Sequence, residues 1–161
     1  MSRDSLDATD RKILNLLQED CRIANQELAA RVGLSPPACL KRVQRLRERG
    51  VIRREVALLD RLAVGQQVLV LVRLALERPR EDLLRAFERK VQEIPEVLSC
   101  WCVAGDHDFV LLVCARTLDE YQSFARTVLA GELNLRRYSS DVVLSIAKET
   151  TAIPLAAAPI S

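Results

Sequence analysis

Residues 34–50 read LSPPACLKRVQRLRERG, and this stretch decides how the N-terminal part of the chain folds. Ser35 offers a hydroxyl at the position of a helix N-cap, and Pro36 follows at the first helical position, where a missing N–H is tolerated. Apolar residues then recur every three positions until a glycine at position 50: Leu40, Val43 and Leu46. The stretch therefore predicts a helix whose apolar face packs inward and whose cationic face points to solvent.

Two shorter helices are expected ahead of it. Asp7 stands where an N-cap belongs, and apolar residues follow at helical spacing until about Asp20: Ile13, Leu14 and Leu17. A second helix of about two turns is expected to end at Gly33, because glycine adopts a positive φ more easily than other residues. Two short helices joined by a glycine-containing turn, with cations on the second, outline a helix-turn-helix.

Positive charge is concentrated on the last of these helices. The chain carries a formal net charge of +2, and residues 1–57 hold 12 Lys and Arg against 8 Asp and Glu. Between Pro36 and Arg54 there are seven cations and a single acid, Glu48. Such a run can be a plain solvated face, but on a helix-turn-helix it points to phosphate. The residues expected to bind duplex DNA, without a division into base and phosphate contacts, are Ser35, Pro37, Lys41, Arg42, Arg45 and Arg49.

The second half of the chain changes to alternating periodicity. After a connection at residues 60–65, strands are expected over residues 66–77, 97–104 and 109–115, with a last strand through Val142, Leu144 and Ile146. Helices are expected over residues 80–94 and 118–130. The order βαββαβ is that of a ferredoxin-like domain, with two helices on one face of a four-stranded antiparallel sheet. The predicted fold class is α+β, with a winged-type helix-turn-helix domain at residues 1–60, a ferredoxin-like domain at 66–150 and a tail at 151–161.

Both faces of this predicted sheet are apolar. In the first strand Val70 and Val72 belong to one face and Leu71 to the other, and the third strand has the same pattern. Two helices cover one face only, and the bare face would exceed the few hundred Å² of apolar surface that a monomer exposes. We therefore expect a homodimer in which a second copy covers this face. A twofold pair of helix-turn-helix units also suits half-sites about one DNA turn apart.

The composition disfavours several classes of protein. The apolar stretches fall well short of the roughly 20 residues that cross a bilayer, and the first residues contain no secretion signal, so a cytoplasmic protein is expected. The five cysteines are odd in number and lie mostly in apolar runs, which indicates reduced thiols. Because His107 is the only histidine, a catalytic or metal site that needs two or more imidazole groups cannot form within one chain. We expect no catalytic residue, no metal site and no cofactor; for Cys100 and Cys102, core packing is favoured over a redox or metal role.

The sequence resembles the leucine-responsive regulatory protein/AsnC (Lrp/AsnC) family. LDATDRKIL at residues 6–14, ELA at 27–29, VGLS at 32–35 and GVI at 50–52 look like that family's DNA-binding half. VAGDHDF at residues 103–109 is similar to the Gly-Asp-x-Asp hairpin, followed by an aromatic residue, of its amino-acid-sensing half. The resemblance covers about residues 6–150. It implies a DNA-binding transcriptional regulator whose homodimers assemble into tetramers or octamers.

The resemblance also implies an amino-acid effector bound between sensing domains. Carried over by position, the effector-binding residues are Gly105, Asp106, His107, Asp108, Ser139 and Ser140. A carboxylate suits an α-ammonium group, and turn amides can receive an α-carboxylate. The alternative is that residues 105–108 form only a hairpin turn.

The chain departs from the family at two helix starts. Ala24 stands where many relatives have Ser or Thr as the N-cap of the second helix, which weakens that end by about 1 kcal/mol unless Asn25 substitutes. At the start of the third helix, Pro37 and Ala38 stand where some relatives have a hydroxyl residue followed by a proline. The contact that this hydroxyl could make to a phosphate or a base is therefore missing.

Two other functions remain open at this point. AsnC-like proteins include sirohaem decarboxylases, but such sites need basic and imidazole groups, and the single histidine disfavours this. A sensing or assembly module without DNA binding is disfavoured by the cationic third helix.

Overall fold

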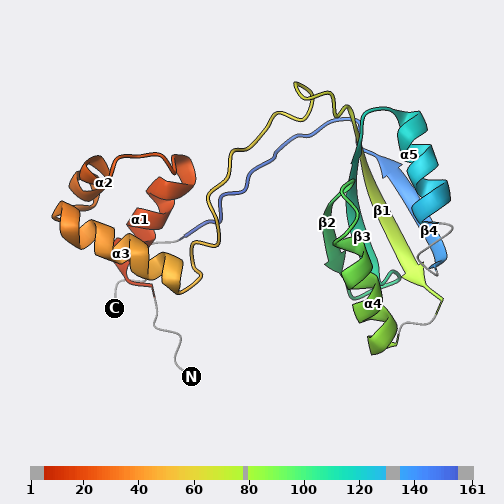
Figure 1. Cartoon of the computed structure of the whole chain (residues 1–161), viewed down its shortest axis with the longest axis horizontal. Coiled ribbons are helices and arrows are strands. Elements are labelled where there is room, and N and C mark those ends of the chain that lie inside the picture. The colour runs from red at the N-terminus through yellow and green to blue at the C-terminus, as the bar shows by residue number, and fades with distance from the viewer. Residues whose placement is uncertain (1–5, 78–79, 130–134, 156–161) are drawn as a thin grey trace. The chain divides into compact units, whose positions relative to one another are not determined.

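The structure, a computed structural model, describes residues 6–77, 80–129 and 135–155. The chain forms two compact units (Figure 1). One contains the described residues up to Ala57 together with those from Lys148 onward, and the other is Leu58–Ala147. Each unit is described by itself below.

The described part of the first unit contains three helices: α1 (Ala8–Glu19), α2 (Asn25–Val32) and α3 (Pro36–Glu48). Asp7 caps α1 as predicted, because its Oδ1 accepts the backbone N–H of Asp10 at 2.7 Å. Gly33 ends α2 in the left-handed conformation at φ +72°. The HTH order of elements expected from the sequence is confirmed.

Neither α2 nor α3 has a side-chain cap at its start. α2 begins at Ala24 without a side-chain cap, and Asn25 does not substitute, since its side-chain Nδ2 donates to the carbonyl of Pro36 at 2.9 Å. Ser35 occupies the N-cap position of α3, but the expected hydroxyl cap is absent. The physical reason is that Pro36 and Pro37 fill the first two helical positions, which leaves few N–H groups for the hydroxyl to accept.

The core of the first unit corrects the predicted face of α3. Cys39, Val43 and Leu46 are buried, whereas Leu40, expected in the core, is 45% exposed. A spacing of four and three residues keeps side chains on one face of a helix, while a strict repeat of three drifts around it. These α3 residues pack against α1 and α2 through Ile13, Leu14, Leu28 and Ala29.

The second unit has the expected βαββαβ order. Its elements are β1 (Val68–Leu76), α4 (Glu81–Val91), β2 (Val97–Cys102), β3 (Phe109–Ala115), α5 (Leu118–Phe124) continued by a π-helical turn (Ala125–Leu129), and β4 (Leu135–Val142). The strands pair antiparallel in the order β2-β3-β1-β4. Residues 53–59, between α3 and β1, form neither helix nor strand. Position 130 of the predicted helix lies outside the described residues.

The last strand lies earlier than predicted. Its expected apolar positions Leu144 and Ile146 follow β4, and Leu144 is 95% exposed. The register explains the shift, because pairing runs from Leu76 opposite Leu135 to Val70 opposite Val142 and so uses almost the whole length of β1. The backbone edge of β1, rather than an apolar pattern, therefore decides which residues become the strand.

One face of the sheet packs on α4 and α5. Val70, Val72 and Leu74 of β1 are fully buried there, and the rings of Phe87 and Phe109 lie 4.4 Å apart between helix and sheet. Both helices lie on this side of the sheet in Figure 1. The expected helical layer over one sheet face is confirmed.

The opposite sheet face bears large apolar side chains that none of the described helices of the unit covers. Trp101 of β2 lies opposite Val110 of β3, on the face away from Cys100. Trp101 is 48% exposed and Leu98 is 56% exposed. Toward β4 this face becomes polar, where Arg73 and Asp141 form an ion pair.

Among the described residues, none of the helices is long and apolar enough to span a membrane.

Candidate nucleic-acid interface and effector site

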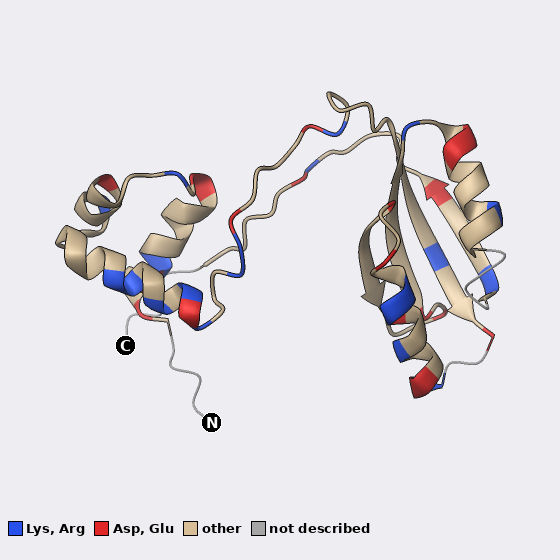
Figure 2. Cartoon of the chain, in the orientation of Figure 1, with Lys and Arg blue, Asp and Glu red and all other residues tan. Residues whose placement is uncertain are grey.

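The cations of α3 lie on two parts of the helix surface. Figure 2 shows the basic residues gathered along α3. Lys41 is exposed and lies roughly opposite the buried residues Cys39 and Val43, given about 100° per residue. Arg42 and Arg45 instead lie on the flank that meets the start of α1, where each forms an ion pair with an acid of α1.

The flank is a four-residue charge cluster between α1 and α3. Arg42 Nη1 donates to Asp7 Oδ2 at 2.6 Å and to Asp10 Oδ1 at 2.8 Å. Arg45 Nη2 donates to both oxygens of Asp10, at 3.1 Å and 2.9 Å. The prediction that the basic face simply points to solvent is therefore wrong for Arg42, whose side chain is 29% exposed.

Burial explains why this cluster forms. The Asp10 side chain is 2% exposed, and a buried carboxylate has to be paired and hydrogen-bonded. The hydrogen bond from Arg42 holds the pKa of Asp7 below its ordinary value, assisted by the backbone N–H of Asp10. The same acids raise the pKa of Arg42. Both groups are thus charged at neutral pH and held together.

The remaining predicted DNA-binding residues have different surroundings. Ser35 and Pro37 are exposed at the start of α3, and Arg45 keeps 48% of its side chain exposed despite its contacts. Arg49 is exposed at the C-cap position. Sequence reasoning missed the pairing acids Asp7 and Asp10; the signal was two acids three positions apart at the start of a helix next to a basic helix.

The predicted effector hairpin is held against the ends of two strands. Its backbone is closed by the N–H of Val103 on the carbonyl of Asp108 at 3.0 Å, and Gly105 has φ +151°. Asp108 is tied to β1, because its Oδ2 accepts the N–H of Leu76 at 2.8 Å and its own N–H bonds the Leu74 carbonyl at 3.0 Å. Arg137 of β4 donates to the carbonyl of Asp106 at 2.8 Å.

These contacts divide the hairpin residues by role. The carboxylate of Asp108 already anchors β1, whereas the side chain of Asp106 is exposed and His107 is half-buried. Arg137 was not singled out from the sequence, and the signal was a pair of arginines, Arg136 and Arg137, a few residues before the predicted last strand. The arrangement offers an acid, turn amides and an arginine at one end of the sheet.

The structure does not bring both candidate serines to one place. Ser140 lies opposite Val72, on the helix-covered face, and its hydroxyl bonds the hydroxyl of Tyr121. Ser139 lies opposite Arg73, on the other face. Since neighbouring strand residues alternate between faces, these two side chains cannot line one ligand together.

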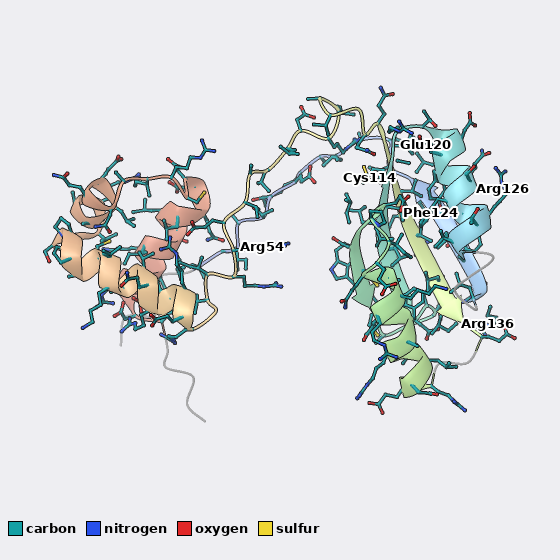
Figure 3. All side chains as sticks on the ribbon, viewed as in Figure 1. Arg54, Cys114, Glu120, Phe124, Arg126 and Arg136 are labelled. Carbon is teal, nitrogen blue, oxygen red and sulfur yellow. The ribbon has the colours of Figure 1, made fainter. Side chains whose placement is uncertain are left out.

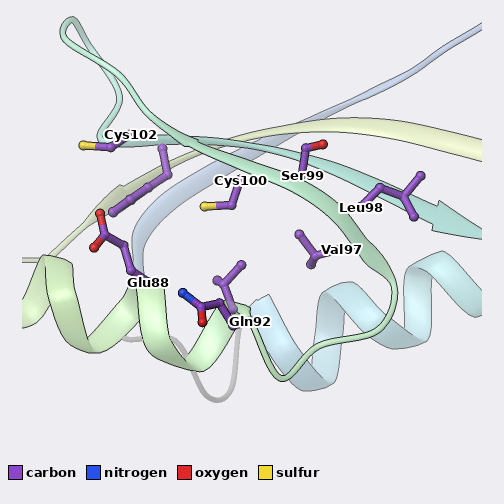
Figure 4. A pocket seen from close by; sticks show the side chains of 9 residues that line it. Glu88, Gln92, Val97, Leu98, Ser99, Cys100 and Cys102 are labelled. Carbon is purple, nitrogen blue, oxygen red and sulfur yellow. The ribbon is translucent and has the colours of Figure 1, made fainter. Parts of the chain in front are cut away.

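The second unit has two cavities, and residues 105–108 line neither of them. A cavity of about 380 Å³ lies between α4 and β2, and Figure 4 shows the side chains of Glu88, Gln92 and Cys100 around it. Burial, then the charges of Glu88 and Cys102, raise the pKa of Cys100 to about 11, so its thiol is protonated at neutral pH. Among the described residues there is no group of three or more His, Cys, Asp or Glu able to hold a metal ion.

The larger cavity, of about 1000 Å³, lies beside α5 and the end of β3. Its lining includes Cys114, Glu120 and Phe124, which Figure 3 labels. Arg116 at its rim forms an ion pair with Glu120. Neither cavity is lined by residues 105–108.

Comparison with known proteins agrees with this division of the chain. Residues 6–53 match the family model for winged helix-turn-helix DNA-binding, and residues 68–153 match the model for the Lrp/AsnC ligand binding domain. The chain is 41% identical to the leucine-responsive regulatory protein of Rhizobium meliloti, over 83% of this chain and 85% of that protein. It is 37% identical to an uncharacterized HTH-type transcriptional regulator of Sinorhizobium fredii, over 93% and 89% of the two chains.

Solved structures give the same result. A transcriptional regulator from Neisseria meningitidis, solved as an L-methionine complex, superimposes with a TM-score of 0.87 at 35% identity, covering 93% of this chain and 97% of that one. An AsnC family transcriptional regulator from Agrobacterium tumefaciens gives a TM-score of 0.85 at 38% identity, covering 96% and 97%. With an HTH unit, a ligand-binding unit and relatives along nearly its whole length, this chain belongs to the Lrp/AsnC family of helix-turn-helix transcriptional regulators.

Proposed function

We propose that the chain binds duplex DNA through α3 and that an amino acid bound to the ferredoxin-like unit modulates this binding. The observation that carries the proposal is the cationic α3 of a helix-turn-helix in the same chain as a Lrp/AsnC ligand binding domain. The proposal makes the chain a regulator and not an enzyme, and it assigns it to the cytoplasm, where its DNA would be.

The proposed DNA contacts follow the exposure of the α3 residues. Ser35, Pro37 and Lys41 lie at the N-terminal half of the helix, the part that enters the major groove in this kind of module. Arg45 and Arg49 extend the cationic surface toward the C-terminal half. Arg42 is assigned an indirect role, because its guanidinium is already bound by two carboxylates.

The proposed effector site is the hairpin of residues 105–108. An exposed Asp106 carboxylate can pair with the α-ammonium group of an amino acid, and turn amides can receive its α-carboxylate. That the effector is an amino acid is supported by related regulators whose solved complexes contain L-methionine. Ser139 is retained as a lining candidate on the open sheet face, whereas Ser140 is engaged with Tyr121.

The proposed assembly is a homodimer formed by the bare face of the sheet, with further assembly into tetramers or octamers. Leu98 and Trp101 are about half exposed on this face, and an isologous contact would bury the same residues on both copies. Sedimentation of the purified protein checks this, since a folded monomer at micromolar concentration would contradict it.

The test of the function combines DNA binding and ligand binding. Mobility-shift titrations with a duplex from the region upstream of the chain's own gene should give affinity that falls with salt, because phosphate contacts release counterions. A thermal-shift screen against the common amino acids should give at least one ligand that raises the melting temperature. Salt-independent or absent duplex binding would overturn the DNA-binding role, and no responding amino acid would overturn the effector role.

A further inference from the structure

The charge cluster at the start of α1 has a one-to-one balance of acids and arginines. Arg45 donates to both oxygens of Asp10, so the buried carboxylate already has a cationic partner. Arg42 also bonds Asp10, but its shortest contact is to Asp7, at 2.6 Å. The charge of Arg42 is therefore balanced by Asp7.

The two members of this second pair differ from Asp10 in accessibility. The side chain of Asp7 is 49% exposed and that of Arg42 is 29% exposed, against 2% for Asp10. In a solvent-exposed ion pair, an ion from solution can replace one partner, whereas it cannot reach a buried carboxylate such as that of Asp10. Arg42 lies on the same helix as the exposed Lys41, so a phosphate that reaches α3 competes with Asp7 for it.

Sequence-independent DNA binding depends on the number of cations that reach phosphates. A carboxylate that occupies one of them lowers this binding and adds repulsion toward the duplex, which favours discrimination between DNA sites. We propose that Asp7 is a specificity-determining residue, which withholds Arg42 from the DNA backbone and so weakens binding to non-specific duplex. This inference rests on the proposed function of α3.

The two oxygens of Asp7 separate this role from helix capping. Oδ1 accepts the N–H of Asp10 and caps α1, while Oδ2 accepts from Arg42. Asn is as good an N-cap as Asp, so Asp7→Asn keeps the capping acceptor and removes the charge that balances Arg42. Asp20→Asn is the matched control, since Asp20 is an exposed acid at the other end of α1 whose Oδ1 accepts the N–H of Arg22 at 2.8 Å.

The experiment measures binding of the full-length protein to a short mixed-sequence duplex over a range of salt concentrations. For Asp7→Asn we expect about three- to tenfold tighter binding at low salt and a plot of log K against log salt that is steeper by about 0.9, the value for one added phosphate contact. Asp20→Asn should leave the slope unchanged. In an Arg42→Gln background, Asp7→Asn should no longer steepen the slope.

Three results would overturn the inference: equal effects of Asp7→Asn and Asp20→Asn, weaker binding by Asp7→Asn, or a slope that steepens without Arg42. Far-UV circular dichroism shows whether α1 is intact, and Asp7→Ser, which also caps a helix, replaces Asp7→Asn if that variant misfolds. The wild-type protein reports separately on the proposed function. If it binds no duplex in a salt-dependent way, the DNA-binding role itself fails.

Discussion

Asp7 combines a helix cap and an ion pair in one side chain, and this makes its contribution to stability depend on pH. Because Arg42 and the N–H of Asp10 lower its pKa from 3.8, the folded state binds the proton more weakly than the unfolded state does. The stabilisation is therefore complete above pH 3.8 and is lost as the pH falls through the lower pKa of the folded protein.

The first prediction compares wild-type protein with Asp7→Asn by urea unfolding between about pH 7 and pH 2.5. The variant should be less stable at neutral pH, because it lacks the ion pair with Arg42. The difference in free energy of unfolding should shrink below pH 3.8, since the wild-type carboxylate then gains its proton. A difference that is constant down to the lowest pH would show that the charge of Asp7 does not contribute.

Cys100 provides a second prediction at this scale. Its pKa is raised from 9.0 to about 11, mainly by burial against α4, so at pH 8 its thiolate fraction is about a hundredfold lower than that of an ordinary cysteine. Alkylation by iodoacetamide, followed by mass spectrometry, should label exposed Cys21 well before half-buried Cys100. In urea the reaction at Cys100 should accelerate to the ordinary rate. Equal labelling rates in the folded protein would contradict the burial of this thiol.

At the scale of single elements, the apolar periodicity of α3 predicted two of its three buried residues. The helix, its proline start and its buried Val43 and Leu46 follow from the sequence, but the third core position is Cys39 and not Leu40. A leucine is more apolar than a cysteine, so composition favours the wrong residue. The angle around the helix decides between them, and it depends on where α1 and α2 lie.

Two substitutions in α3 test this assignment. Leu46→Ala should lower the free energy of unfolding by about 3 kcal/mol, because Leu46 is fully buried and its loss leaves a cavity. Leu40→Ala, the same chemical change on the same helix, should cost about 0.5 kcal/mol, because the side chain is 45% exposed. Both values come from urea denaturation. A large loss of stability in Leu40→Ala would indicate that another chain covers this residue.

The position of β4 was not predicted by the alternation of apolar and polar residues. Its residues include Tyr138, Ser139 and Ser140, a polar run that no alternation rule selects, whereas the apolar Leu144 beyond it is solvent-exposed. The strand forms because β1 offers a complete edge of backbone hydrogen-bonding groups. The hairpin of residues 105–108 was identified by resemblance, but the anchoring role of Asp108 depends on long-range contacts with β1 that the sequence does not display.

At the scale of the whole molecule, the chain returns to its first unit after completing the second. Gln18 of α1 pairs with the backbone of Ile153 in both directions, accepting its N–H at 2.7 Å and donating to its carbonyl at 3.1 Å. Leu155 packs against the core formed by α1, α2 and α3. The segment predicted to be a C-terminal tail is thus, over its described residues, a structural part of the first unit. Sequence reasoning could not find this, since only one side-chain amide and one leucine carry the contact.

The last prediction follows from that return. A chain that stops after Ala152 loses the Gln18 pairing and the packing of Leu155, so the helix-turn-helix unit should lose about 1–3 kcal/mol of stability. A chain that stops after Leu155 is the matched control, because it keeps both contacts. Hydrogen exchange resolved by peptide should show faster exchange in α1 for the shorter chain only, with the strands of the second unit unchanged. Equal exchange in the two truncated chains would mean that the returning segment does not stabilise α1. Faster exchange of α1 in the shorter chain only would establish that residues 153–155 stabilise the first unit.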